Sequence, residues 1–166
     1  FFRDIYGHNE LKLQLIESVK NGRIPHAQLF CGPEGVGKLP LALAYAQYVS
    51  CENKGDNDSC GQCPSCKKYA ALIHPDLHFV YPIIKKKKAE DDEYCAEHLN
   101  GWRDIITASP YFNMDKWVEE EFSSVSTKQP LIYNCEGAEL LRKLQIKSCE
   151  SEYKVVIIWH PELMHK

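Results

Sequence analysis

The sequence lacks an apolar run long enough to cross a membrane, because such a helix needs about 20 consecutive apolar residues. A secretory signal is missing as well, since no basic segment followed by an apolar stretch precedes the first expected helix at residues 9–20. These absences predict a cytoplasmic protein. The first residue is Phe1 rather than Met, so we expect the sequence to be part of a longer chain.

An excess of one sign of charge is also absent. The 20 Lys and Arg residues nearly balance the 23 Asp and Glu residues, for a formal net charge of −3. A general electrostatic attraction to nucleic acid is therefore not expected, and any contact with DNA would be local or made through partners. The 166 residues, 44% of them hydrophobic, suffice for one α/β core and a small satellite.

One hydroxyl is missing from a phosphate-binding loop. Residues 32–39 read Gly-Pro-Glu-Gly-Val-Gly-Lys-Leu, which departs from the pattern G-x-x-x-x-G-K-[ST] only at its last position. In that pattern the loop N–H groups cradle phosphates, the Lys reaches the terminal phosphates, and the hydroxyl ligates Mg²⁺. Leu39 has no oxygen to offer. Pro40 removes a further N–H donor and is expected to bias Leu39 away from helical dihedrals.

The rest of the loop keeps its glycines and its positive charge, so the backbone can still approach an anion closely. One interpretation is a weakened nucleotide site with weak or no ATP binding, and the other is a Gly-rich turn without a ligand. We predict a degenerate nucleotide-binding site formed by Gly32, Gly35, Val36, Gly37, Lys38 and Leu39.

Cysteine is plentiful, and four of the eight cysteines form a cluster. Cys60, Cys63 and Cys66 are separated by two residues each, and Cys51 precedes them. This spacing lets four thiolates converge on one tetrahedral ion, which favours a structural zinc module over residues 51–66. An iron–sulfur cluster or free thiols are the alternatives. The isolated cysteines are expected to be small buried hydrophobes: Cys31, Cys95, Cys135 and Cys149.

Helix-like and strand-like patterns alternate along the chain. Apolar residues at helical spacing predict helices at residues 9–20, 41–49, 65–73, 99–106, 114–122 and 136–148. Short apolar runs predict strands at residues 27–31, 77–81 and 153–158, the last buried on both faces. The alternation predicts an α/β fold with a parallel sheet flanked by helices. His74 and His78 are expected at a turn and on a strand surface.

Residues 85–130 fit this alternation least well. Lys85 to Lys88, followed by an acidic run at 90–93, predict a solvated loop. The aromatic residues after it are expected to form a small core of their own rather than a base-stacking platform, because basic residues do not interleave them. They are Trp102, Tyr111, Phe112 and Trp117.

A second magnesium-binding feature is missing where the last strand ends. In a phosphate-loop ATPase this strand ends in an acidic pair that holds Mg²⁺ and orients the attacking water. Here Trp159 and His160 follow the strand, and Glu162 lies out of register with it. Both departures affect the same magnesium-dependent step, so the sequence predicts a protein that does not hydrolyse ATP.

Together these features resemble the bacterial DNA polymerase III clamp-loader AAA+ subunits. The motifs occur in family order and cover most of the chain except residues 85–130, which are identified as a family-atypical insertion. The residues that carry the resemblance are Ile24 to Phe30 leading into the loop at 32–38, the four clustered cysteines, His74-Pro75-Asp76-Leu77-His78, and Tyr153 to Ile158.

The resemblance implies that residues 1–166 form an N-terminal AAA+ domain, with the lid and the collar beyond Lys166. Leu39, Trp159 and His160 place the chain with the delta-prime type, a stator that needs no ATP hydrolysis, rather than with the gamma/tau motor type. The implied partners are the gamma/tau and delta subunits and, indirectly, the sliding clamp and primed DNA.

Two alternatives stay open. One is an ATP-hydrolysing motor of the gamma/tau type with unorthodox magnesium ligands. The other is a zinc-dependent nucleic-acid-binding module that uses Lys67, Lys68 and the lysines at 85–88.

Overall fold

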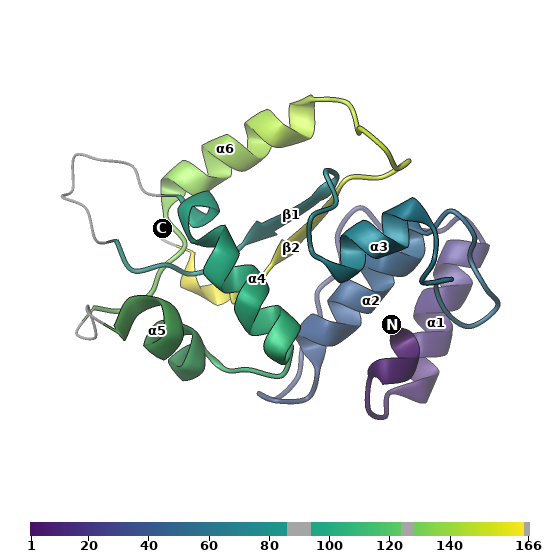
Figure 1. Ribbon diagram of the computed structural model, residues 1–166, viewed down its shortest axis with the longest axis horizontal. Helices are drawn as coiled ribbons and strands as arrows, with labels where there is room; N and C mark the ends of the chain where they lie inside the picture. The colour runs from purple at the N-terminus through teal and green to yellow at the C-terminus, as the bar shows by residue number, and fades with distance from the viewer. Residues whose placement is uncertain (86–93, 124–127, 165–166) are drawn as a thin grey trace.

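The computed structural model describes residues 1–85, 94–123 and 128–164 (Figure 1). In this part of the chain no helix combines the length and the apolarity that spanning a membrane requires. The helices are α1 (Asn9–Lys20), α2 (Lys38–Ser50), α3 (Pro64–Ala70), α4 (Leu99–Ala108), α5 (Met114–Phe122) and α6 (Asn134–Gln145), with short 3₁₀ turns at Phe2–Asp4, Cys95–His98 and Pro161–Leu163.

Two parallel strands form the sheet, β1 (Leu77–Val80) and β2 (Val155–Ile158). Leu77 pairs with Val155 and Val80 pairs with Ile158. The strands lie in the middle of the molecule in Figure 1, with α6 above them, α4 and α5 to the lower left, and α1, α2 and α3 to the right. Parallel strands need a crossover between them, and residues 81–154, with α4, α5 and α6, supply it.

The main core lies between the sheet and the aromatic segment at residues 94–123. Trp102 and Trp117 are fully buried there, and the ring of Tyr81 stacks on Trp102 with centroids 4.1 Å apart. The indole N–H of Trp117 donates a hydrogen bond to the carbonyl oxygen of Pro82 at 2.8 Å, so a polar atom deep in the core is satisfied. The predicted packing of the aromatic residues is thus confirmed at Trp102, Trp117 and Phe112, but they do not form a core of their own, because they belong to the core of the sheet.

A second core joins α1 to α2. The helix expected at residues 9–20 is confirmed residue for residue, because its apolar side chains fall on one face and Asn21-Gly22 ends it. That face packs against α2, which is apolar all round and buried between the two cores. The residues that meet are Leu15, Ile16 and Val19 of α1 with Leu41, Tyr45 and Tyr48 of α2.

Two strand predictions need correction. Residues 27–31 form no strand, and Leu29 is 76% exposed, because the β1–β2 pair offers this segment no neighbouring backbone for a hydrogen-bond ladder. The strand at the end of the chain does form, but it is shorter than predicted and is not buried on both faces. Ile157 points into the core, whereas Ile158 is 37% exposed.

Helix boundaries differ from the prediction mainly at the ends. The helix expected at 65–73 stops at Ala70, because Leu72 adopts a left-handed backbone conformation. The helix expected at 136–148 begins at Asn134 and ends at Gln145. The charged run at 86–93 lies outside the described residues.

Candidate functional site

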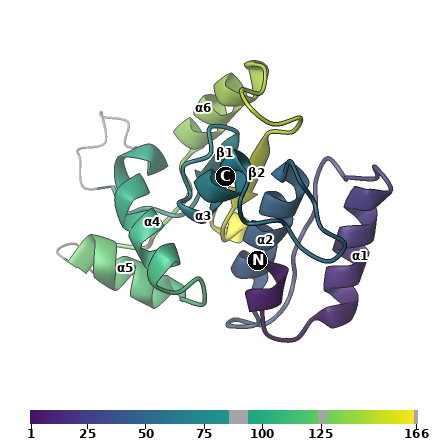
Figure 2. The same ribbon diagram turned by 45° about the vertical axis from the view of Figure 1, so that its right-hand side comes forward.

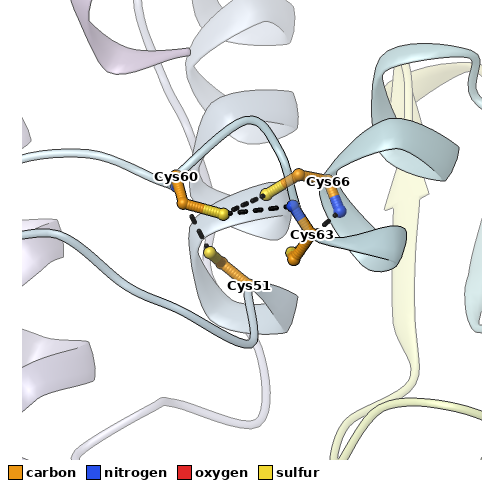
Figure 3. Close-up of side chains that lie close together, drawn as sticks. All are labelled: Cys51, Cys60, Cys63 and Cys66. Carbon is orange, nitrogen blue, oxygen red and sulfur yellow. Dashed lines mark hydrogen bonds between the residues drawn. The ribbon is translucent and has the colours of Figure 1, made fainter.

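The four clustered cysteines converge where the chain leaves α2 and enters α3 (Figure 3). Cys51 caps the C-terminus of α2, Cys60 lies in the connecting loop, and Cys63 and Cys66 belong to the start of α3. Pro64 occupies the first position of α3, where a missing N–H costs nothing, and the Cys63 sulfur accepts the N–H of Cys66 at 3.4 Å. The turn therefore places two sulfur atoms on the same side of one helix end.

The sulfur atoms are spaced as ligands of one ion would be. All four Sγ atoms lie within 4.8 Å of one another, and those of Cys60 and Cys66 are 3.9 Å apart. Four sulfurs at the usual zinc distance in a tetrahedron are about 3.8 Å from each other. Cys51, Cys63 and Cys66 are buried and Cys60 is half-buried, so most of the cluster is shielded from solvent. The cluster could bind a metal, and its all-sulfur donor set suits a closed structural site.

Backbone N–H groups around the cluster favour thiolates. The sulfur of Cys60 accepts the N–H groups of Gln62 at 3.4 Å and Cys63 at 3.3 Å, and these bonds lower the pKa of Cys60 to about 6. Burial acts in the opposite direction and raises the pKa of Cys51 and Cys66. A bound cation would offset that cost, because metal binding selects the deprotonated thiol.

A buried polar cluster ties α3 to the strands. Asp76 is fully buried, and its carboxylate accepts N–H groups from Cys149, Glu150 and Ser151 at 2.7 to 2.9 Å. Lys68 of α3 reaches both oxygens of Glu150, at 2.5 and 2.6 Å. The segment that leads into β2 is therefore held from both sides.

His74 belongs to the same cluster and lies at a turn, as predicted, because its carbonyl oxygen accepts the N–H of Leu77 at 3.1 Å, but the turn is buried. His74 is 2% exposed, its ring lies 4.7 Å from that of Tyr69, and its Nδ1 accepts the N–H of Asp76 at 3.1 Å. Burial lowers the pKa of His74. His78, the second residue of β1, is half-buried, and burial lowers its pKa as well.

The Gly-rich loop at residues 32–38, which the sequence predicts to be a degenerate phosphate loop, forms a turn before α2. Gly35 and Gly37 have φ angles of 76° and 92°, which favour glycine, and α2 begins directly after Gly37. Lys38 folds back over the loop and donates to the carbonyl oxygens of Gly32 and Pro33 at 2.8 Å each. His8, which precedes α1, donates from Nε2 to the carbonyl oxygen of Val36 at 2.7 Å. The positive charge thus stays at the loop, but loop carbonyls occupy two of its three donors.

A cavity of about 380 Å³ adjoins this loop between α1 and residues 28–31. Leu11 and Leu15 of α1 line it on one side, and Phe30 and Val36 line it on the other, with Lys38 at the loop end. The lining is mostly apolar, and the loop's cation is its main charged group.

Leu39 stands where the phosphate-loop pattern has Ser or Thr, and the prediction that Pro40 moves it out of helical conformation is wrong. Leu39 is the second residue of α2 and is helical, so Pro40 does not push it out of the helix. Pro40 lies in the first turn, where its N–H would have no intrahelical partner in any case. The side chain of Leu39 is 7% exposed and belongs to the main core. The position that carries a magnesium ligand in the phosphate-loop sequence pattern is therefore a packing position here.

The same holds at the end of β2. The N–H of Trp159 donates to the carbonyl oxygen of Val80 at 2.9 Å, and its ring packs on the main core. His160 and Glu162 pair with each other at 2.5 Å in the turn that follows. Because β2 ends at Ile158, Glu162 lies outside the strand, as expected from its register.

Tyr111 does not lie in the aromatic core, where the sequence predicts it. It is 37% exposed and lies against the Gly-rich loop at Gly37. A methyl group at Gly37 would come within 3.1 Å of its ring. No sequence signal announces this contact, because it depends on how α4 packs.

The isolated cysteines and the lysines considered for nucleic-acid binding lie in different surroundings. Cys95 is buried as predicted, but Cys31 and Cys149 are exposed and Cys135 is half-buried. Of the lysines considered for nucleic acid, Lys68 is paired with Glu150, and Lys85 lies 4.6 Å above the ring of Tyr133. Lys67 is exposed, and the lysines at 86–88 lie outside the described residues. Two of the lysines considered for nucleic-acid binding, Lys68 and Lys85, therefore make contacts within the protein.

Comparisons with known proteins point to subunits of DNA polymerase III. A family model described as DNA polymerase III, delta subunit, matches residues 7–166. DNA polymerase III subunit delta' of Bacillus subtilis is 41% identical over 119 residues, which are 64% of this chain and 36% of that protein. The delta' subunit of Pseudomonas aeruginosa is 34% identical over 82 residues, 48% of this chain and 25% of that protein. Subunit tau of Escherichia coli is 36% identical over 90 residues, 54% of this chain and 14% of that protein. The chain thus spans about a third or less of the length of these relatives.

Proposed function

The chain belongs to the DNA polymerase III delta subunit family, and we propose that it serves a clamp loader as a delta-prime-type subunit that does not hydrolyse ATP. In this proposal residues 1–166 are an AAA+ nucleotide-binding domain used as a rigid partner surface. Its partners are the gamma/tau and delta subunits, and through them the sliding clamp and primed DNA.

One observation carries the proposal. The two positions that should hold Mg²⁺ in a phosphate-loop ATPase are Leu39 and Trp159, and both pack on the main core. Neither side chain offers an oxygen to a cation that demands oxygen ligands in octahedral geometry. Because both lie within packed structure, restoring a ligand at either position would remove buried apolar contacts.

Zinc at the four cysteines completes the proposal as a structural element. Cys51, Cys60, Cys63 and Cys66 would hold the ion with no position left for water, so the metal would supply folding energy and no chemistry. The ion would fix the connection between α2 and α3 and, through the contact of Lys68 with Glu150, the segment that enters β2.

The test is a reconstituted clamp loader that contains the full-length protein and its gamma/tau and delta partners. We expect Lys38→Ala to leave ATP turnover and clamp loading within about twofold of the unchanged assembly, as does the control Lys20→Ala on the exposed end of α1. Omission of the protein should abolish loading. A Lys38→Ala variant that assembles normally but loses turnover would instead support the ATP-hydrolysing gamma/tau-type motor.

A further inference from the structure

The connection between α4 and α5, residues 109–113, runs beside the N-terminal end of α2 in both views (Figures 1 and 2). Tyr111 lies at its centre. Its Cε1 would be 3.1 Å from a methyl group placed on Gly37, the residue that caps α2. Its hydroxyl accepts the N–H of Tyr6 at 3.4 Å, and the two rings are 6.5 Å apart. The ring is thus held between the phosphate loop and the segment before α1.

The next residue, Phe112, contacts the end of β2. Its ring lies 5.0 Å from that of Trp159 and 5.6 Å from that of Trp102. Trp102 and Trp159 are themselves 5.3 Å apart, so the three rings form one aromatic cluster. Consecutive residues of one short connection therefore reach the cap of the phosphate loop and the strand end where an acidic pair is missing.

Leu39 and Trp159, the two departures from the ATPase pattern, help to form the core on which this connection packs. Leu39 and Trp102 belong to the same buried core, and Phe112 and Trp159 pack against it. A Ser or Thr at 39 would place a polar group within this core and an Asp at 159 would place one against it, and burying polar groups without partners is unfavourable. The loss of magnesium ligands and the packing of the connection are thus two aspects of one arrangement.

We propose that residues 109–113 are an internal plug of the phosphate loop. Tyr111 covers the N-terminal end of α2, where an anion would meet the free N–H groups of the first turn, and Phe112 anchors the plug on Trp159. The plug holds the loop in one conformation and keeps polyphosphate out. This inference rests on the proposed function, in which residues 32–39 are a disabled phosphate loop.

The plug can be removed with little disturbance of the core. Tyr111 is 37% exposed, whereas Phe112 is half-buried among the aromatic rings. Tyr111→Ala removes the ring from Gly37, and Tyr111→Phe is the matched control that keeps the ring and loses only the hydroxyl contact with Tyr6. Tyr111→Leu is a milder truncation in case the alanine variant is poorly folded.

The experiment measures amide hydrogen exchange at residues 35–39 of the full-length protein, together with calorimetric titration of ATP in EDTA. We expect exchange to be at least about tenfold faster in Tyr111→Ala than in the unchanged protein, with ATP binding about tenfold tighter. Tyr111→Phe should match the unchanged protein, and Tyr111→Leu should lie between.

Unchanged exchange in Tyr111→Ala and Tyr111→Leu would overturn the plug. Faster exchange without any gain in ATP affinity would also overturn it, because the ring would then order the loop without excluding a ligand. Tight magnesium-dependent binding of ATP by the unchanged protein would contradict the proposed function instead, so the two failures are distinguishable.

Discussion

The carboxylate of Asp76 accepts the backbone N–H of Glu150 at 2.8 Å. Asp76 directly precedes β1, and Glu150 lies in the segment that leads into β2. The carbonyl oxygen of Asp76 also accepts the N–H of Val155 at 2.8 Å, next to the first pair of the parallel ladder. A single buried residue therefore sets where the two strands begin relative to each other.

Replacing Asp76 should be among the most damaging single changes outside the apolar core. Hydrogen bonds to a charged acceptor contribute about 1.5–3 kcal/mol each, and three N–H donors would lose theirs in part. We expect Asp76→Asn to lower the free energy of unfolding by about 3 kcal/mol, measured by urea denaturation. The exposed Asp104→Asn should stay within about 0.5 kcal/mol, and equal effects of both changes would show that the buried contacts contribute nothing.

The same residue gives the stability a defined pH dependence. Burial opposes ionisation of Asp76, but the N–H groups of Glu150, Cys149 and Ser151 outweigh it and lower its pKa below the ordinary value of 3.8. Its contribution is fully present above the pKa of the unfolded chain and is lost as pH falls through the lower pKa of the folded state. Unfolding measured from pH 6 down to about pH 2 should therefore lose more stability in the unchanged protein than in Asp76→Asn. Parallel curves would contradict the lowered pKa.

The cysteine cluster predicts metal content and metal-dependent stability. We expect about one zinc ion per chain by elemental analysis, and none in Cys63→Ser, because three sulfurs leave the tetrahedral site open. The exposed Cys31→Ser should keep its zinc. Chelation should lower the melting temperature of the unchanged protein, whereas iron in the purified protein would favour the cluster alternative.

Restoring a hydroxyl at the phosphate loop should cost stability and gain no function. Leu39→Thr removes buried apolar volume and places an oxygen in the main core, so we expect the free energy of unfolding to fall by about 2 kcal/mol. ATP titration should show no magnesium-dependent binding by this variant, because Trp159 still occupies the second position. Magnesium-dependent binding after this single change would mean that one residue alone disables the site.

Much of the architecture follows from local patterns. Apolar spacing is enough to place α1, because its stripe and its Asn-Gly stop are both local signals. The spacing of the cysteines is enough to anticipate that their sulfur atoms meet, since Pro64 starts a helix between two of them. The residue types at Leu39 and Trp159 are likewise enough to predict that neither position offers a ligand to Mg²⁺.

Contacts between segments far apart in the sequence could not be predicted from such local patterns. The apolar residues at 27–31 look like a strand, but a strand forms only where another strand supplies its hydrogen bonds, and β1 and β2 pair with each other. The burial of His74 could not be predicted, because it depends on contacts with Tyr69 and Asp76 that no local pattern indicates. The contact of Tyr111 with Gly37 depends on the path between α4 and α5.

We propose that this subunit supports a clamp loader without itself using Mg²⁺ and ATP. Calorimetric titration of ATP into the full-length protein, with and without Mg²⁺, is the measurement to make first. We expect either no binding or weak binding that is the same in both conditions. Tighter binding in Mg²⁺, lost on Lys38→Ala, would contradict it.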